Sequence, residues 1–380
     1  MKRKEFLNKA SKIGMTLPFL SLANSCQLEK EAPPKKQLPS YWMWMRPSTK
    51  ESDDHWKREF EKIRNLGIEA VLPQIYASNK ALFNIDNYET EQPLLEQLIP
   101  LAHSAGLQLH AWMWTMPCNH PDILSNHPDW YVVNRKGESA NTDPAYVDYY
   151  KFLCPRKEET RRFVQKRVEA LAAISELDGI HLDYVRMPDV ILAEGLQPKY
   201  NIVQDQEYPE YDYCYCSTCR SSYKEKTGVD PMSIEDPAND ETWYQFRYDA
   251  VVDMVNDYLV PAAKAKDKLI TAAVFPNWES VRQQWHKFNL DGFLPMLYHG
   301  FYNEGIDWIG IETEKALTRL NHKKPVYSGI FLPHLSGPED LKSAIQSGYA
   351  GGASGFCLFA YNDLKDPIAD ALPNIIKSLN

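Results

Sequence analysis

The stretch LDGIHLDYVR, residues 177–186, has the pattern of an apolar β-strand that ends in an aspartate and an arginine. Alternation along an extended strand places Asp183 on the same face as His181 and Val185. Barrel enzymes carry catalytic residues at such carboxyl-terminal strand ends. A buried carboxylate is costly unless it is hydrogen-bonded or paired, and Arg186 is close enough to be its partner. Asp183 is therefore the first catalytic candidate, and a purely structural Asp183–Arg186 pair is the competing interpretation.

Seven other strand-like runs accompany this one and alternate with segments of helical period. Such alternation is typical of β/α units around a parallel sheet. Eight strands, each followed by a helix, predict an α/β fold of the (β/α)₈ or TIM-barrel type over residues 41–380. A doubly wound open sheet is the alternative, and no Gly-x-Gly-x-x-Gly motif supports it. The predicted strands are 41–46, 70–77, 107–115, 179–186, 269–276, 292–299, 326–332 and 355–361. The predicted helices are 53–65, 93–105, 157–175, 243–266, 306–321, 338–348 and 368–379.

The longest connections, residues 116–156 and 187–242, follow the third and fourth predicted strands. Loops that follow strands build the active-site face of a barrel. We therefore expect these two insertions to form walls of a substrate cleft.

Residues 1–25 have the pattern of an export signal, because basic residues precede an apolar stretch, 13–23, that is too short to span a bilayer. Small residues before Cys26 resemble a bacterial lipobox, in which that cysteine becomes the lipidated N-terminus. Two other interpretations of this segment are a plain secretory signal and a twin-arginine signal in which one arginine is replaced by lysine. Residues 26–40 read as a flexible tether. The sequence predicts an exported periplasmic or cell-surface lipoprotein whose only membrane contact is the lipid.

The composition is that of a folded, acidic protein. The 380 residues are 44% hydrophobic and 24% charged, with a formal net charge of −9. Without a basic patch after residue 40, this charge disfavours nucleic acid as a partner. Aromatic residues make up 12% of the chain, which suits sugar stacking and buried packing equally well. The oligomeric state stays open.

Three segments carry a resemblance to a known family: residues 178–188, residues 107–114 (LQLHAWMW) and residues 291–302 (DGFLPMLYHGFY). Together they resemble the glycosyl-hydrolase-like family ten of bacterial TIM-barrel proteins, over residues 41–380. The resemblance implies a barrel that acts on carbohydrate, with its main carboxylate on the fourth strand. It implies no particular sugar.

Glycosidases generally need two carboxyl groups, one protonated and one ionised. We expect Asp183 to be the ionised one, a nucleophile or charge stabiliser, so it needs a partner. Glu304 ranks first, because related superfamilies place an acid/base residue after the sixth strand. Glu279, after the fifth strand, ranks second, and Asp363, after the eighth, ranks third. Each of the three also reads as an ordinary solvated loop carboxylate.

Polar and aromatic side chains near the strand ends form a set that suits a polyol. Polar groups would bind hydroxyls, and aromatic faces would stack on the apolar face of a sugar ring. Inward barrel packing is the alternative for each residue. The predicted substrate-binding residues are Trp44, Arg46, Gln74, Tyr76, His110, Trp112, Trp114, Arg186, Tyr298 and His299.

Three cysteines, Cys214, Cys216 and Cys219, form a C-x-C-x-x-C motif in the second long insertion. The motif resembles the zinc cluster of barrel β-galactosidases, whose fourth ligand comes from another loop, and Cys118 and Cys154 are the candidates for that ligand. A structural zinc, disulfides and free thiols remain open. Whichever holds, the role is structural, and no catalytic cofactor is predicted. The remaining cysteine of the barrel, Cys357, reads as a small core residue.

The sequence therefore predicts an exported glycoside hydrolase that cleaves a poly- or oligosaccharide with a carboxylate pair at the barrel mouth. A non-catalytic carbohydrate-binding lipoprotein on the same barrel is the alternative. Metal-dependent deacetylation is weaker, because no His-x-x-x-His or Asp-Asp pattern lies at a strand end. A second carboxyl oxygen about 5–10 Å from Asp183 would favour hydrolysis.

Overall fold

The computed structural model describes residues 37–85 and 92–379. The predicted signal, Cys26 and most of the predicted tether lie outside these residues. The last four tether residues, 37–40, contact the barrel, and the Ser40 amide donates to a Glu69 carboxylate oxygen at 2.7 Å. None of the described helices is long and apolar enough to cross a membrane.

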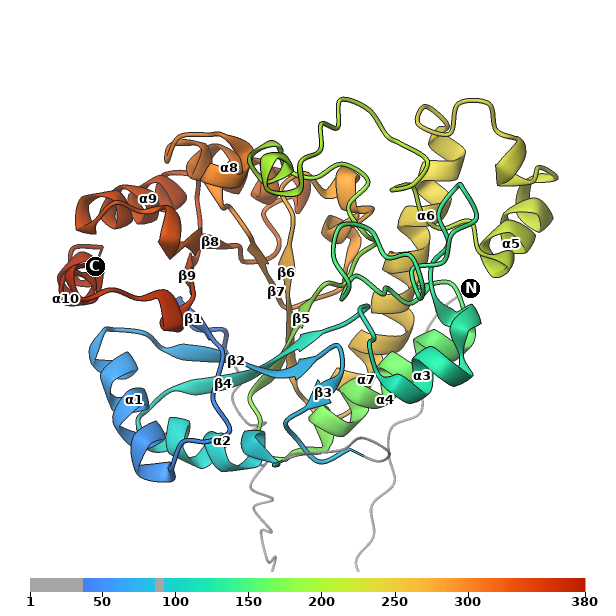
Figure 1. Cartoon of the computed structure of the whole chain (residues 1–380). Coiled ribbons are helices and arrows are strands. Elements are labelled where there is room, and N and C mark those ends of the chain that lie inside the picture. The colour runs from blue at the N-terminus through green and yellow to red at the C-terminus, as the bar shows by residue number, and fades with distance from the viewer. Residues whose placement is uncertain (1–36, 86–91, 380) are drawn as a thin grey trace, which may run out of the picture. The chain divides into compact units, whose positions relative to one another are not determined.

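Eight parallel strands form the barrel, with helices around it (Figure 1). Bridges between β7 and β8 complete the ring, and there the Leu297 amide donates to the Gly329 carbonyl at 3.0 Å. The predicted TIM barrel is confirmed. The strands are β1 (Tyr41–Met45), β2 (Ala70–Ala77), β4 (Gln108–Trp114), β5 (Gly179–Asp183), β6 (Leu269–Val274), β7 (Gly292–Pro295), β8 (Tyr327–Phe331) and β9 (Gly355–Phe359), and a short β3 (Lys80–Ala81) pairs antiparallel with β2.

The predicted helices are all present, and one of them is interrupted. Its residues form α6 and α7, which are joined by a π-helical segment, Met254–Leu259. The short helices α3 and α5 lie in the two long connections and were not predicted. The helices are α1 (Asp53–Asn65), α2 (Leu94–Ser104), α3 (Pro121–Asn126), α4 (Glu158–Ala173), α5 (Ser217–Thr227), α6 (Glu241–Asp253), α7 (Val260–Lys264), α8 (Trp308–Arg319), α9 (Pro338–Ala350) and α10 (Asp366–Lys377).

Large and small side chains fill the barrel interior together. The indoles of Trp42, Trp44 and Trp112 pack in one cluster with residues as small as Ala70 and Ala273. Layers of inward side chains make such a barrel a packed core and not a pore. A ligand can therefore enter only at the barrel ends.

A buried polar layer lies beneath the carboxyl-terminal mouth. The Trp44 indole N–H donates to Nε2 of His181 at 3.1 Å, so the proton of the neutral imidazole is on Nδ1, which donates to Thr271 Oγ1 at 2.9 Å. Burial lowers the pKa of His181 to about 3, which keeps the ring neutral. This layer supports the end of β5 from below.

The two long connections run side by side above the carboxyl ends of β4 and β5 (Figure 1). Residues 115–157 and 184–240 are joined by a bridge between Asn134 and Tyr213 and by a 2.7 Å hydrogen bond from the Tyr215 amide to the Val133 carbonyl. They meet through loop contacts and have no regular sheet between them.

Candidate active site

A pocket of about 250 Å³ opens at the carboxyl-terminal ends of the strands, and its walls are mostly aromatic. Strand ends and both long connections contribute to it. The lining residues are Arg46, Trp112, Trp114, Tyr149, Tyr150, Asp183, Tyr184, Arg186, Asp189, Leu192, Leu196, Tyr200, Phe275, Met296, Tyr298, Phe301, Tyr302, Phe331 and Phe359. Only four of these residues, two arginines and two aspartates, carry charge, so each of them carries weight in the chemistry of the pocket.

Asp183 is the last residue of β5, and its side chain is only 7% exposed. The Trp112 indole N–H donates to Oδ2 at 3.0 Å, and the Tyr184 amide donates to Oδ1 at 2.7 Å. The chain turns directly afterwards, because Tyr184 has a φ of 51°, in the left-handed region. Two donors and a turn thus fix the carboxyl group at the mouth, where the sequence predicted it.

Burial raises the pKa of Asp183 to about 6, since an ionised carboxylate is poorly solvated there. The hydrogen bonds from Tyr184 and Trp112, and the charges of Arg186 and Arg46, act in the opposite direction and are outweighed. A carboxyl group that holds a proton close to neutral pH is suited to act as a general acid.

Arg186 forms its ion pair with Asp189 and not with Asp183, which corrects the predicted pairing. The Arg186 Nη1 atom lies 2.9 Å from Asp189 Oδ2, and the two side chains are 3% and 7% exposed. Three residues separate them, so a tight loop after the strand brings them together, whereas Asp183 points into the barrel mouth. The guanidinium group also lies 4.6 Å from the ring centre of Phe275. Asp183 therefore has no dedicated counterion in this loop.

Five of the ten predicted substrate-binding residues line the pocket: Arg46, Trp112, Trp114, Arg186 and Tyr298. The other five lie elsewhere. Trp44 and His110 point into the packed interior below the mouth. Tyr76 follows a bulge in β2 that turns it outward, where it accepts a hydrogen bond from Arg167. His299 lies beyond the end of β7 and faces His334, and Gln74 does not reach the pocket lining.

The predicted partner carboxylates are not brought to the pocket. Glu304 and Glu279 are exposed in the loops after β7 and β6, and Asp363 lies in a turn after β9. None of the three belongs to the lining. The chain reverses at Asn303, with a φ of 56°, which carries Glu304 away from the mouth. The second carboxyl group in the lining is Asp189.

Sequence reasoning missed Asp189 and most of the aromatic wall. Phe331 and Phe359 are the last residues of β8 and β9, and Phe275 directly follows β6. Aromatic residues at three predicted strand ends could have indicated an aromatic pocket wall from the sequence. The adjacent Tyr149 and Tyr150 come from the first long connection, for which periodicity gives no orientation.

Four buried cysteines form a cluster beside the pocket loops: Cys154, Cys214, Cys216 and Cys219. Cys154 Sγ lies 3.5, 3.8 and 3.6 Å from the sulfurs of Cys219, Cys214 and Cys216. A tetrahedral zinc with Zn–S bonds of about 2.3 Å separates its sulfurs by about 3.8 Å, so the cluster fits that ion. The fourth member is Cys154, whereas the other candidate, Cys118, lies outside the cluster.

Disulfides are absent among the described cysteines, all six of which are free thiols. The sulfur separations in the cluster are well above the roughly 2.05 Å of a disulfide bond. Cys357 is fully buried in the barrel interior, as predicted.

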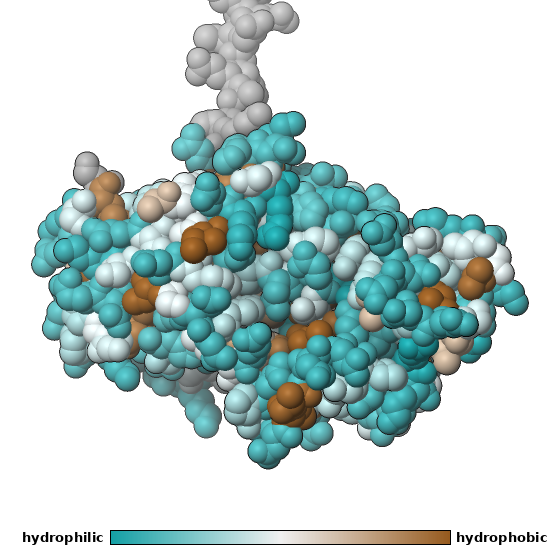
Figure 2. Space-filling model, turned by 90° about the horizontal axis from the view of Figure 1, so that it is seen from above, coloured by the Kyte–Doolittle hydropathy of each residue, from teal (hydrophilic) through white to brown (hydrophobic). Residues whose placement is uncertain are grey.

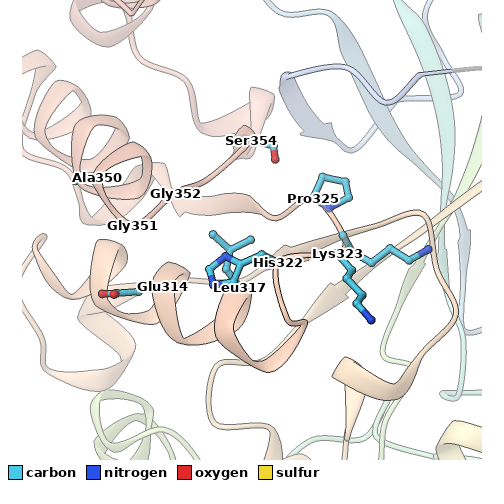
Figure 3. Close-up of a pocket in the computed structure, with 10 residues that line it drawn as sticks. Glu314, Leu317, His322, Lys323, Pro325, Ala350, Gly351, Gly352 and Ser354 are labelled. Atoms are coloured by element: carbon cyan, nitrogen blue, oxygen red, sulfur yellow. The ribbon is translucent and has the colours of Figure 1, made fainter.

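Figure 2 shows a face on which hydrophobic residues form only small, separate groups. A hollow drawn in Figure 3, near His322, Pro325 and Gly352, lies at the turns that precede β8 and β9. It is therefore at the opposite barrel end from Asp183, and barrel active sites do not occur there.

Comparison with known proteins identifies the family. The family described as glycosyl hydrolase-like 10 matches residues 42–318. The chain belongs to the glycosyl hydrolase-like 10 family. This confirms the resemblance found in the sequence. No curated protein matches this glycosyl hydrolase-like 10 chain.

Solved structures similar to this glycosyl hydrolase-like 10 protein share its fold at low identity. The PgaB (BpsB) glycoside hydrolase domain from Bordetella bronchiseptica has a TM-score of 0.69 at 13% identity, covering 88% of this chain and 98% of its own. The catalytic domain of a β-amylase from Paenibacillus polymyxa has a TM-score of 0.64 at 11% identity, covering 90% and 98%. A β-galactosidase from Marinomonas ef1 has a TM-score of 0.63 at 12% identity, and 59% of that chain is covered. The barrel is thus one on which glycosidases occur.

The first prediction concerns the cost of burying Asp183. Between about pH 4, the pKa of an unfolded aspartate, and the folded value of about 6, the native state holds more protons, so the wild type loses stability as pH rises. Asp183→Asn removes this loss. The melting temperature of the variant, relative to that of the wild type, should therefore increase from pH 4 to pH 8. The corresponding change in the free energy of unfolding is at most about 3 kcal/mol.

The exposed Asp370 on α10 provides the control. Asp370→Asn should give a difference that barely changes over the same pH range. A difference for Asp183→Asn that is equally flat would show that Asp183 is not destabilised by its surroundings.

Proposed function

We propose that this protein is a glycoside hydrolase in which Asp183 is the proton donor. The observation that carries the proposal is a desolvated carboxyl group, oriented by two hydrogen-bond donors, in an aromatic pocket at the mouth of a glycosidase-like barrel. The family and the barrel fold support a carbohydrate substrate. The protein would cleave a poly- or oligosaccharide.

In the proposed reaction Asp183 gives its proton to the glycosidic oxygen as the bond from that oxygen to the anomeric carbon breaks. Positive charge then develops on the sugar ring, and water supplies the new oxygen on the anomeric carbon. Asp189 is our candidate for accepting the proton of that water, because it is the other carboxyl group in the pocket lining. The aromatic rings stack on the sugar and exclude bulk water, which strengthens these electrostatic interactions.

A non-catalytic carbohydrate-binding protein is the second candidate. The observation that favours it is the ion pair of Asp189 with Arg186, which occupies one oxygen of the second carboxylate. A binding protein would need the aromatic wall and would not need a protonated Asp183. Screening the purified protein against bacterial, plant and host glycans for released sugars separates the two candidates.

The second prediction is that Asp183→Asn lowers turnover of a glycan identified in that screen by at least about 10³-fold, equal to about 4 kcal/mol of barrier. Wild-type kcat/KM should fall as pH rises through about 6, because a general acid must be protonated. Asp189→Asn, measured alongside, shows whether the second carboxyl group of the pocket is needed. Near-normal turnover of a folded Asp183→Asn variant would contradict the assignment, and Asp370→Asn again serves as the control.

We further propose that the protein is exported and anchored through a lipid on Cys26. The support is the order of basic, apolar and small residues before that cysteine. Our third prediction is that the mature protein begins at Cys26 and carries a lipid mass. Mass spectrometry of the N-terminal peptide measures this, and a mature N-terminus at another residue, or an unmodified Cys26, would contradict it.

The four-cysteine cluster is proposed to hold one structural zinc ion. Cys154 comes from the first long connection and the other three ligands from the second, so the ion would link the two loops. Tyr149 and Tyr200, one from each loop, both line the pocket. Four thiolates close the coordination sphere and leave no position for substrate, so the ion would shape the pocket without taking part in the reaction.

The fourth prediction is that the purified protein contains about one zinc per chain and melts at a lower temperature after chelation, because structural metal binding is coupled to folding. Cys154→Ser should lower the zinc content measured by elemental analysis. Cys118→Ser, at a buried cysteine outside the cluster, should leave it unchanged. Metal-free protein whose thiols react only after reduction would instead demonstrate disulfides.

A further inference from the structure

The charges in the pocket do not all cancel. Arg186 is paired with Asp189, which leaves Arg46 and Asp183. Arg46 follows β1, is exposed, and has no ion-pair partner among the residues that the structure describes. When Asp183 is protonated, as proton donation requires, the pocket carries one uncompensated positive charge at Arg46.

Arg46 is held in place at the pocket wall. The Arg46 amide donates to Asn362 Oδ1 at 2.8 Å, and Asn362 Nδ2 donates to the Arg46 carbonyl at 3.1 Å. The guanidinium carbon lies 4.9 Å from the ring centre of Phe359, another lining residue. Backbone and side chain are thus both constrained, while the N–H groups of the guanidinium remain available to a ligand.

Some hydrogen-bond donors of the wall have no partner in the described part of the chain. The Trp114 indole N–H and Arg186 Nε are buried and have no acceptor among the described residues. Both oxygens of Asp183, in contrast, already accept hydrogen bonds. A buried donor without an acceptor is unfavourable, and a ligand oxygen that reached it would offset this cost. Tyr149 packs against Trp114, with 5.4 Å between the ring centres, and is 38% exposed.

We infer that the pocket binds a sugar residue that carries a carboxylate, a uronic acid, and that Arg46 recognises this carboxylate. The inference deepens the proposed function, since it names the substrate class for the same pocket. A planar carboxylate matches the paired N–H groups of a guanidinium, and the sugar ring fits the aromatic walls. The remaining ring oxygens would accept from the unpartnered wall donors.

A bound uronate would also help the proposed chemistry. Its negative charge near Asp183 disfavours ionisation of that carboxyl group, which keeps the proton in place for donation. The chain as a whole is acidic, with a formal net charge of −9, so long-range attraction of an acidic glycan is not expected. Recognition therefore depends on the local charge of Arg46.

The test compares methyl glucuronides with methyl glucosides, and methyl galacturonides with methyl galactosides, as both anomers. Within each pair, the uronide carries a carboxylate where the neutral glycoside carries a hydroxymethyl group. Binding to the wild-type protein is measured by calorimetry at pH 5 in low salt. At least one uronide should bind about tenfold more tightly than its neutral counterpart, as expected for a charge-assisted hydrogen bond. Arg46→Met, which keeps an unbranched side chain, should abolish the preference, and Arg46→Lys should retain part of it.

Arg58→Met, at an exposed position on α1, is the matched control and should leave the preference intact. Equal binding within each pair, or no binding of any uronide, would overturn the inference. A uronide preference that survives Arg46→Met would overturn the assignment of Arg46. Because binding is measured without turnover, uronide binding by a protein that hydrolyses no glycan would overturn only the proposed hydrolase activity.

Discussion

The candidate site is organised around one buried carboxyl group that is held by two hydrogen bonds at the end of a strand. The Asp183 carboxylate accepts hydrogen bonds from the Trp112 indole N–H and the Tyr184 amide. Both bonds depend on how β4 and the turn after β5 are positioned. Trp112 must point inward from β4, and the chain must turn at Tyr184 with a positive φ. A solvated aspartate would need neither. Burial destabilises the charged form, and this cost is the same property that makes the group useful as an acid.

The pocket walls face a different constraint, because the two long connections that build them pack through one apolar cluster but share no regular sheet. Tyr146 donates to the Asp189 carbonyl at 2.9 Å and stacks on Tyr211 at 4.6 Å, which fastens one connection to the other. Buried side chains of Arg247 and Arg282 contact Asp212 beneath the second connection. The cysteine cluster lies within the same region. Cross-links of several kinds thus replace the regular hydrogen bonding that stabilises the barrel.

Much of the barrel could be predicted from the sequence, because strand and helix periods are local properties. The place of Asp183 followed from the same alternation. Tyr76 was misplaced because a bulge in β2 reverses the side-chain direction, and such a bulge leaves no mark in the hydrophobic pattern. Glu304 was misplaced because the loop after β7 reverses at Asn303. Asp189 was missed because ion pairing within a loop depends on the loop fold, which residue spacing alone does not define.

The small number of charged groups in the pocket limits how it can orient a ligand. A neutral polyol has several hydroxyl groups, and each needs a partner when the sugar is desolvated. Tyrosine hydroxyls of the lining can bind some of them and the aromatic rings can cover large apolar areas, but only two arginines and two aspartates of the lining carry charge. Affinity for a ligand would therefore come mainly from stacking, and orientation would come from the few charged contacts. Because these contacts surround Asp183, the groups that orient a ligand also control whether that carboxyl group keeps its proton.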